Sequence, residues 1–416
     1  MKPALTSLLL AAAIMAASAN SRAQSTSRPP NIVFFLVDDL GWRDLACYGS
    51  SFYETPSIDR LARDGVRFTQ AYAACHVCSP TRASIMTGKY PARLHLTDWL
   101  SGRRDFPFQK LGNARIHQHL PLEERTLAET LKQHGYATGH FGKWHLGEDP
   151  AGPLQQGFDV QVPRWNKGWP RAGYHAPFKL DGLRDADGDY LTDRLTDEAL
   201  KFVEQNRDRP FFLYLSHFAV HDPIQGRPDL VGKYRRKLAT MERGKGPAFI
   251  LEGNPDDPEP LTRQDLAALM TRPSHRGFKA LPRRTVKIKQ HQDNIEFAAM
   301  IEAMDESLGR VAATLDALGL AENTIVIFFS DNGGMSGANL GNPKRIVPDR
   351  KLDVAFATSN LPLRGAKGWL YEGGIRVPMI VKWPGRGKAG TVCDEPVIST
   401  DFFPAILEMA GLPASR

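Results

Sequence analysis

The feature that most constrains the fold of this chain is a set of short segments that are apolar throughout and rich in β-forming residues. The first is residues 31–37 (NIVFFLV), and similar runs cover 210–216, 324–329 and 374–383. A strand that is apolar at every position is buried on both faces, which is typical of a parallel sheet covered by helices on either side. The sequence therefore predicts several buried strands of such a sheet.

Segments with helical signals lie between these runs. Thr55, with the proline that follows it, is expected to begin a helix that ends at Gly65. Thr126 and Glu129 form a capping box for a second helix, and residues 294–318 carry apolar side chains at helical spacing. Strands that alternate with helices predict a doubly wound, mostly parallel α/β sheet flanked by helices.

Polar side chains follow two of the apolar runs directly. Asp38 and Asp39 come after the first run, and Asp331 and Asn332 come after the third. In doubly wound folds ligands gather at the carboxyl ends of the strands, so these side chains should lie together. Their oxygens are hard ligands that suit Ca²⁺ or Mg²⁺ and not a soft metal. A pair of aspartates alone is often a turn, but a second polar strand end favours a metal site.

One cysteine stands in a context that favours chemistry. Cys78 begins the stretch CSPTR, and a Thr-Gly pair ending in Gly88 follows. We expect Ser79 to cap a helix whose first residue is Pro80, which places Cys78 just before a helix N-terminus that favours anions. Arg82 lies about one turn into this helix, on the Cys78 side. Taken alone, such a cysteine is more often a buried structural residue.

The pattern C-x-P-x-R followed by Thr-Gly resembles the signature of the sulfatase family, the formylglycine-dependent, arylsulfatase-like branch of the alkaline phosphatase superfamily. A second family signature is present as GYATGHFGKWH at 135–145. The similarity runs from about Pro30 to the end of the chain. It implies an alkaline phosphatase-like fold, and it implies that a separate maturation enzyme oxidises Cys78 to formylglycine. One hydroxyl of the hydrated aldehyde would attack sulfur, and the other would later expel sulfate.

The resemblance also implies the ligands of the metal. Asp38, Asp39, Asp331 and Asn332, together with the formylglycine at Cys78, would hold a cation that is usually Ca²⁺ in this family, with Mg²⁺ as the alternative. The ion would polarise a sulfate oxygen and lower the pKa of the diol.

Further residues match the positions that act on the sulfate group in the family. The resemblance implies that Lys143 contacts the diol and the sulfate, and that His145 is the base for the elimination. His221 and Lys367 would bind sulfate and protonate the leaving alcohol, and Arg82 would help to stabilise charge on the transferring group. Lys143 and His145 would share a face in an extended chain. The alternative for these two is a core histidine and a surface lysine.

The resemblance predicts a sulfuric ester hydrolase that acts on a sulfated carbohydrate. Two stretches, TGKYPARLHLTDWL and QHQDNIEFAAMIEAMDES, resemble a bacterial branch that acts on sulfated galactose or N-acetylgalactosamine. A phosphodiesterase or phosphonate monoester hydrolase is the alternative, because some relatives with this nucleophile cleave such esters. A non-enzymatic carbohydrate-binding relative would have lost the nucleophile, the metal ligands or the lysines. Asp98 and Trp99 are candidates for sugar contact, although a tryptophan is more often a core residue.

The N-terminus shows the features of a signal peptide in the right order. Lys2 is followed by a short apolar run and by small residues, with cleavage expected after Ala19 or Ala23. The predicted organisation is a signal peptide at 1–23 and a catalytic domain at 30–416, exported to the periplasm or the exterior. An ordinary N-terminal helix is the alternative. No stretch is long enough to span a bilayer, and four cysteines are too few for a disulfide scaffold.

The formal net charge of +7 comes from one region, since residues 231–290 hold 14 Lys or Arg against 6 Asp or Glu. The surrounding segment 224–292 is rich in Pro and Gly and is interpreted as an irregular insertion over the site. Its charge is interpreted as a solvated surface, the alternative being a rim that attracts a polyanionic substrate. No motif for nucleic-acid binding is recognisable. Family members usually continue beyond TDFFPAILEMAGLP into a small C-terminal subdomain, which is expected to be missing because the sequence ends at Arg416.

Overall fold

The structure is a computed structural model, and it describes residues 28–105, 111–242, 244–252, 262–265, 268, 286–337 and 356–413. The predicted signal peptide at 1–23 and parts of the predicted insertion at 224–292 lie outside these residues. Within the described ranges, no helix has the length and apolar character needed to cross a membrane.

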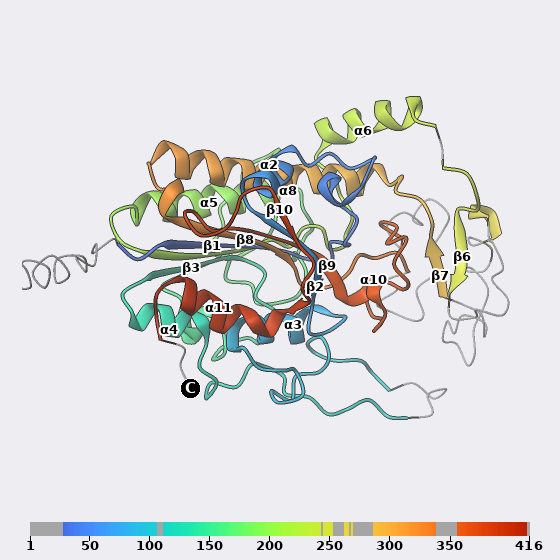
Figure 1. Ribbon diagram of the computed structural model, residues 1–416. Coiled ribbons are helices and arrows are strands. Elements are labelled where there is room, and N and C mark those ends of the chain that lie inside the picture. Colours follow the sequence, from blue (N-terminus) through green and yellow to red (C-terminus); the bar gives the residue numbers. More distant parts are fainter. Residues whose placement is uncertain are drawn as a thin grey trace, which may run out of the picture.

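A central mixed sheet runs through the described part of the chain (Figure 1). Its strands are Asn31–Val37 (β1), Val66–Tyr72 (β2), Ala137–Gly142 (β3), Val160–Val162 (β4), Phe211–Ser216 (β5), Thr324–Ser330 (β8), Arg376–Lys382 (β9), Thr391–Cys393 (β10) and Val397–Ile398 (β11). The order is β10-β2-β9-β8-β1-β5-β3-β4, with β11 paired to β2. Only β9 runs antiparallel to its neighbours, β2 and β8, among these pairs. The predicted mostly parallel sheet is confirmed.

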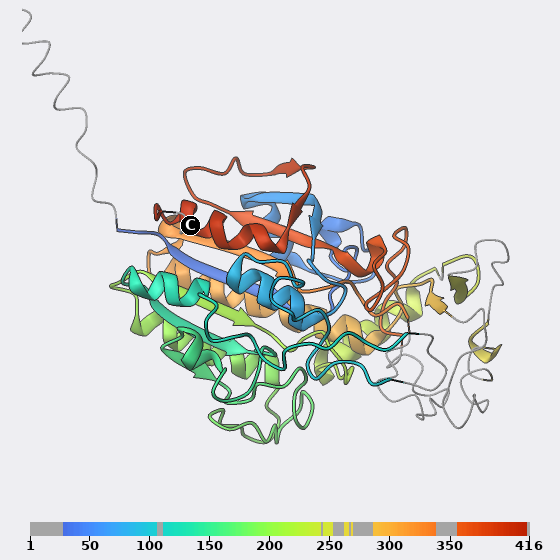
Figure 2. The same ribbon diagram turned by 90° about the horizontal axis from the view of Figure 1, so that it is seen from below.

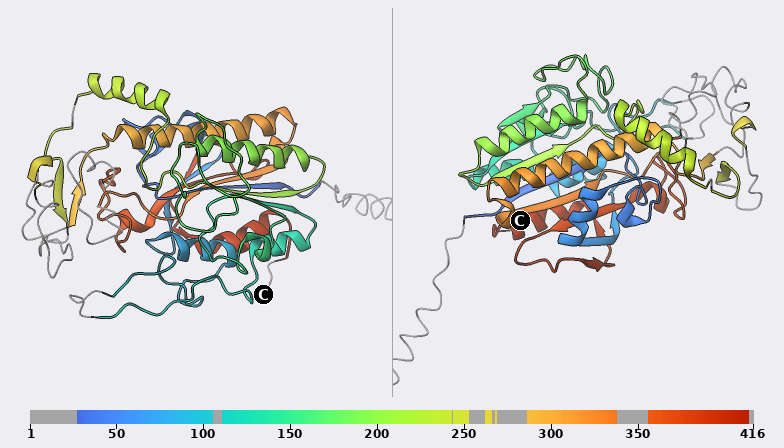
Figure 3. Two further views of the ribbon diagram at one scale, coloured as in Figure 1. Left: turned by 180° about the vertical axis from the view of Figure 1, so that it is seen from behind. Right: turned by 90° about the horizontal axis from the view of Figure 1, so that it is seen from above.

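Helices cover both faces of the sheet, as Figures 1 and 3 show. One layer holds Pro56–Asp64 (α2), Leu191–Gln205 (α5) and Ile295–Ala317 (α8), and the other, seen in Figure 2, holds Cys78–Thr87 (α3), Leu127–Gln133 (α4) and Phe402–Met409 (α11). Val33 and Phe35 of β1 pack in the core between the sheet and α8, whereas Phe34 and Leu36 pack in the core on the opposite face, between the sheet and α3 and α11. Each face of β1 therefore has a helical layer to bury it, which explains why this strand is apolar at every position.

The predicted helix starts are found with different capping partners. Thr126 and Glu129 form the predicted capping box of α4. Thr55 is the N-cap residue of α2, but its side chain does not cap the helix. Asp305 of α8 does so instead, because its carboxylate accepts from Ser57 N at 3.0 Å and from Ile58 N at 2.7 Å. The first turn of α2 is thereby tied to α8.

The helix that carries the cysteine begins two residues earlier than predicted. Cys78 is the first residue of α3 and Val77 is its N-cap, so the expected cap at Ser79 is wrong. Ser79 Oγ instead accepts from Leu100 N at 3.1 Å, which fastens the loop that follows the helix. Gly88 ends the helix with a φ of 67°, as its sequence position indicates.

Two elements differ from the sequence prediction near the ends of β8 and β9. β9 begins two residues later than the predicted run at 374–383, because Glu372–Ile375 forms a short helix, α10. Phe249–Glu252 (β6) pairs with Val286–Lys289 (β7) at one end of the molecule, beyond Pro228–Thr240 (α6) (Figures 1 and 2). Lys289 N donates to Ser336 O at 3.0 Å, so this pair of strands is joined to the loop after β8.

Candidate active site

The carboxyl ends of β1 and β8 lie side by side, since the two strands pair in parallel register along their whole length. Asp38, Asp39, Asp331 and Asn332 are thereby brought together, and all four are fully buried. Asp39 N donates to Asp331 Oδ1 at 3.2 Å, and Asn332 Nδ2 donates to Asp39 Oδ1 at 2.8 Å. The four side chains named from the two strand ends thus form one cluster.

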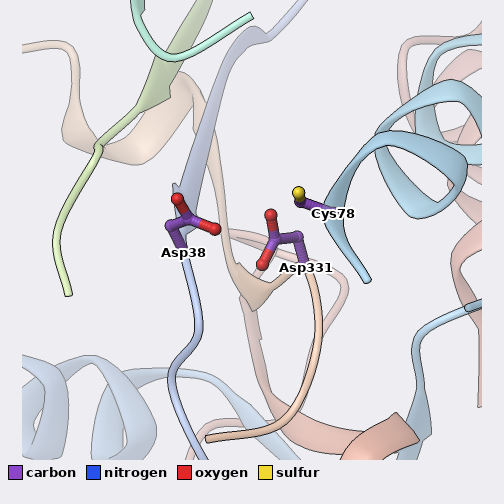
Figure 4. Close-up of side chains that lie close together, drawn as sticks. All are labelled: Asp38, Cys78 and Asp331. Atoms are coloured by element: carbon purple, nitrogen blue, oxygen red, sulfur yellow. The ribbon is translucent and has the colours of Figure 1, made fainter. Parts of the chain in front are cut away.

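Cys78 faces this cluster from the N-terminus of α3 (Figure 4). One ligand atom each of Asp38, Cys78 and Asp331 lies within 4.8 Å of the others. Asp38 Oδ1 and Asn332 Oδ1 are buried, and neither has a hydrogen-bond partner among the described residues. Leaving such oxygens buried without a partner is costly, and a hard divalent cation would satisfy both. The residues present therefore fit Ca²⁺ or Mg²⁺.

Each carboxylate of the cluster has its own cationic partner. Two of these cations are buried, and the third is 14% exposed. The pairs are Arg82 Nε with Asp331 Oδ2 at 2.8 Å, Lys143 Nζ with Asp38 Oδ2 at 2.5 Å, and Lys367 Nζ with Asp39 Oδ2 at 2.6 Å.

The carboxylates of Asp38 and Asp331 respond differently to this environment. Burial raises the pKa of Asp38 well above its usual value, and repulsion from Asp331 raises it further, although Lys143 opposes both. Burial alone would also raise the pKa of Asp331, but Arg82 and Lys143 hold it below its usual value. Lys143 therefore compensates the ionised form of Asp38 only in part, and a cation bound beside Asp38 would supply the rest.

The imidazole of His145 is held between the cysteine and a backbone carbonyl. Its Nδ1 lies 3.1 Å from Cys78 Sγ, and its Nε2 lies 2.8 Å from Leu100 O. A carbonyl oxygen can only accept, so we assign the proton to Nε2, and Nδ1 then presents a lone pair to Cys78. Burial and the nearby charge of Lys143 lower the pKa of His145 well below its usual value, which keeps the ring neutral.

The spacing of Lys143 and His145 predicted that they share a face of an extended chain, but the chain is not extended here. Both follow β3, and His145 has a φ of 57°, in the left-handed region. The chain turns at Gly142, where a Cβ would fall 1.9 Å from Ser216 O, so only glycine fits against β5. This turn sends Lys143 to Asp38 and His145 to the cysteine.

His221 lies on the other side of the cluster, after β5. Its Nε2 is 3.7 Å from Asp39 Oδ2, and its Nδ1 is 2.8 Å from Asp222 O and 3.0 Å from Asp222 Oδ1. Burial and the charge of Lys367 lower the pKa of His221, but Asp39 and Asp222 outweigh them and raise it to about 9. These carboxylates therefore favour the protonated imidazole, which can donate a proton.

Sequence reasoning missed the groups that position these side chains. Ser216 Oγ accepts from Arg82 Nη1 at 2.6 Å, and Leu100 O holds the His145 ring. Gly168 lies against that ring, since a Cβ built on it would fall 2.2 Å from His145 Cε1. These contacts come from a hydroxyl at the end of β5, a backbone carbonyl and a close-packed glycine, and no sequence motif marks them. The two predicted sugar contacts, Asp98 and Trp99, lie in the same loop as Leu100.

Comparison with known proteins identifies the family to which the chain is similar. The Sulfatase family profile matches residues 30–412. The steryl-sulfatase of Mus musculus is 30% identical over 94% of this chain and 63% of its own length, and the N-acetylgalactosamine-6-sulfatase of Mus musculus is 30% identical over 95% of this chain and 65% of its own length. The crystal structure of Ps i-CgsB in complex with k-i-k-neocarrahexaose has a TM-score of 0.66 and 25% identity, covering 93% of this chain and 73% of that chain. The chain thus spans just under two thirds of the length of the two curated relatives.

Proposed function

This chain belongs to the sulfatase family, and we propose that it hydrolyses sulfuric esters of a sulfated carbohydrate with a formylglycine made from Cys78 as nucleophile. The observation that carries the proposal is the placement of Cys78, which lies within 4.8 Å of the ligand oxygens of Asp38 and Asp331 and 3.1 Å from His145 Nδ1. The N-acetylgalactosamine-6-sulfatase relative and the neocarrahexaose bound to Ps i-CgsB support a carbohydrate substrate, with galactose or N-acetylgalactosamine as the sulfated sugar.

We propose that Asp38, Asp39, Asp331 and Asn332, with the modified Cys78, hold Ca²⁺ or in its place Mg²⁺. When bound, such an ion polarises a sulfate oxygen and lowers the pKa of the nucleophile. The unpartnered buried oxygens of Asp38 and Asn332 support this assignment.

The sulfur of Cys78 stands in for the hydroxyl oxygens of a hydrated formylglycine. His145 Nδ1 lies within hydrogen-bond distance of that position, and Leu100 O holds the opposite nitrogen in its protonated form. His145 is therefore placed to take a proton from a hydroxyl group at Cys78. Arg82 is buried and bonded to Asp331, so it fixes a metal ligand and adds positive charge beneath the reacting group.

His221 and Lys367 lie around Asp39 and are placed to act on the ester. The carboxylates of Asp39 and Asp222 favour the protonated form of His221, and this form is placed to donate to the departing alcohol oxygen. Lys143 and Lys367 each place an ammonium group at the cluster, where two fixed positive charges stabilise the oxygens of a transferring sulfate.

The wider context of the enzyme is also a proposal. We propose that residues 1–23 direct export to the periplasm or the exterior, that a formylglycine-generating enzyme acts on Cys78, and that residues 30–416 form the catalytic domain, with 224–292 inserted beside its active site. The hydrogen bond from Lys289 N to Ser336 O supports the last point, because Ser336 follows the metal-binding strand end by four residues.

The test is to identify the anion that the protein releases. Protein co-expressed with a maturation enzyme would be given 4-nitrophenyl sulfate, N-acetylgalactosamine 6-sulfate and bis(4-nitrophenyl) phosphate, with formylglycine content measured by mass spectrometry. We expect sulfate release that a chelator and Cys78→Ala abolish, and that the matched variant Cys393→Ala retains. Cleavage of the phosphodiester without any sulfate release, in protein with confirmed formylglycine, would replace the proposal with the phosphodiesterase alternative.

A further inference from the structure

The loop at 97–103 is fastened beside the nucleophile at two points. Leu100 N donates to Ser79 Oγ at 3.1 Å, and Leu100 O accepts from His145 Nε2 at 2.8 Å. The loop therefore forms a wall of the active site rather than a free surface segment. Figure 1 shows the chain that leaves α3 continuing below this helix.

Two charged side chains of this loop have no part in the proposed mechanism. Asp98 Oδ1 accepts from Trp99 N at 2.9 Å and Asp98 Oδ2 accepts from Arg103 N at 3.2 Å, so the backbone of the loop fixes the carboxylate. Arg103 Nε lies 3.7 Å from the same Oδ2. The side chain of Asp98 is 19% exposed and that of Arg103 is 46% exposed. The pair is thus anchored at one end and open to solvent at the other.

The pair lies against the segment that carries Lys367. Gly368 N donates to His76 O at 2.9 Å, which joins this segment to the residues just before Cys78. A Cβ on Gly368 would lie 3.7 Å from Arg103 Nη2, so the guanidinium group sits beside the backbone next to Lys367. Arg103 is therefore located between the nucleophile side and the sulfate-binding side of the site.

His76 adds a third polar group at the same place. Its Nδ1 is buried and has no hydrogen-bond partner among the described residues. The backbone of His76 accepts from Gly368 N at 2.9 Å, and Gly368 in turn lies beside the guanidinium group of Arg103. His76 therefore belongs to the same part of the molecule as Arg103, two residues before Cys78.

We infer that Asp98 and Arg103 form a subsite for neutral hydroxyl groups on the sugar ring that carries the sulfate, an inference that rests on the proposed function. A guanidinium group without an acidic partner would suit a second sulfate or a carboxylate of the substrate. Arg103 has Asp98 beside it, so the pair is neutral overall and offers both acceptors and donors. Two neighbouring ring hydroxyls match this set, because one donates to Asp98 and the other accepts from Arg103. The pair then selects among sulfated sugars by the presence and direction of those hydroxyls.

The kinetic test compares a sugar ester with an aryl ester that has no ring hydroxyls. kcat/KM would be measured for N-acetylgalactosamine 6-sulfate and for 4-nitrophenyl sulfate, at equal formylglycine content, in Asp98→Asn and Arg103→Ala. We expect the ratio of the two kcat/KM values to fall by about 10- to 100-fold, the loss typical of a hydrogen bond to a charged group. Arg104→Ala is the matched control, since it removes the same charge from the next, exposed residue, and it should leave the ratio unchanged.

A binding test gives a readout that needs no turnover. Calorimetry on Cys78→Ser protein would compare a panel of monosaccharide sulfates with inorganic sulfate, with and without Arg103→Ala. The inference expects the variant to weaken binding of the sugar sulfates far more than binding of inorganic sulfate. Equal weakening of both, an unchanged kinetic ratio, or sugar sulfates that bind the parent protein no more tightly than inorganic sulfate would each overturn it. If the enzyme without substitutions, with confirmed formylglycine, released sulfate from no ester, the proposed function would be refuted. The binding result would still decide the subsite.

Discussion

The contact between Gly168 and the ring of His145 gives a sharp test of the assigned geometry. A Cβ at position 168 would lie 2.2 Å from the ring Cε1, 2.5 Å from Nδ1 and 2.6 Å from Nε2. Carbon atoms in contact stay about 3.5 to 4.0 Å apart, so Gly168→Ala forces the two groups to separate by about 1.3 Å or more. Gly168 is not among the residues with a positive φ, so alanine is allowed by the backbone and the clash accounts for the effect.

The imidazole cannot move by that amount without losing a contact. A shift breaks either the 3.1 Å approach of His145 Nδ1 to Cys78 Sγ or the 2.8 Å hydrogen bond to Leu100 O. Misplacing a catalytic group by about 1 Å can reduce the rate about 100-fold. We therefore expect kcat for 4-nitrophenyl sulfate to fall by about two orders of magnitude in Gly168→Ala.

The assay needs two accompanying measurements and one control. Formylglycine content by mass spectrometry and the melting temperature would show that the variant is matured and folded. Gly232→Ala is the matched control, because its Cβ in α6 meets no atom closer than Arg236 Nη1 at 3.6 Å, and it should keep the full kcat. A fully matured, stably folded Gly168→Ala protein that turns over at the normal rate would refute the assigned position and role of His145.

Burial raises the pKa of Asp44 from 3.8 to about 7. The folded state thus holds this proton more tightly than the unfolded state does. The stability that the proton contributes is present below pH 3.8 and is lost as the pH rises through about 7. Asp44→Asn should therefore remove a fall on the order of 4 kcal/mol in the free energy of unfolding across this range, measured by urea unfolding at several pH values, and an unchanged slope would contradict the assignment. Ca²⁺ should raise the melting temperature by an amount that grows with its concentration, and Asp331→Asn should lose that increase, whereas equal increases in both proteins would exclude Asp331 as a ligand. Arg82→Met leaves the carboxylate of Asp331 buried without its partner, so the free energy of unfolding should fall by about 3 to 5 kcal/mol. The exposed control Arg60→Met should lose about 1 kcal/mol or less. Similar small losses for both variants in urea unfolding would show that the buried pair does not contribute to stability.

The two central strands β1 and β8 could be predicted from the sequence, whereas β2 could not. β1 and β8 are buried at every position, so apolar runs mark them, and the acids that follow them are placed by the parallel pairing of the two strands. β2, with the sequence VRFTQAY, is only partly buried at most positions and carries no comparable signal. A similar limit explains why the Ser79 prediction was wrong. Its side chain accepts a hydrogen bond from Leu100 N, and only the folded chain brings Leu100 near.

The candidate site divides in a similar way. The residues that carry charge or a nucleophile, such as Cys78 and Lys367, could be named because motifs surround them. The groups that orient them could not, because a backbone carbonyl or a close-packed glycine acts through its position and not through its residue type. Leu100 O and Gly168 reach His145 from segments that are distant in the sequence, and only the tertiary structure shows that they meet.

The charges of the cluster show why a metal and an anionic ester can share it. The three carboxylates of the cluster face three fixed cations, and His221 has Asp222 as an additional acidic partner, so the protein alone is close to neutral there. A bound divalent cation would leave a net positive site that attracts a sulfate ester. Arg82 and Lys143 are buried beside their carboxylates, whereas Lys367 and His221 are 14% and 13% exposed. If a cation held by the proposed ligands offset the charge of Asp39, these two groups would become available to the substrate. The ion pairs at the carboxyl ends of β1 and β8 would thus keep the positive groups in position for the ester.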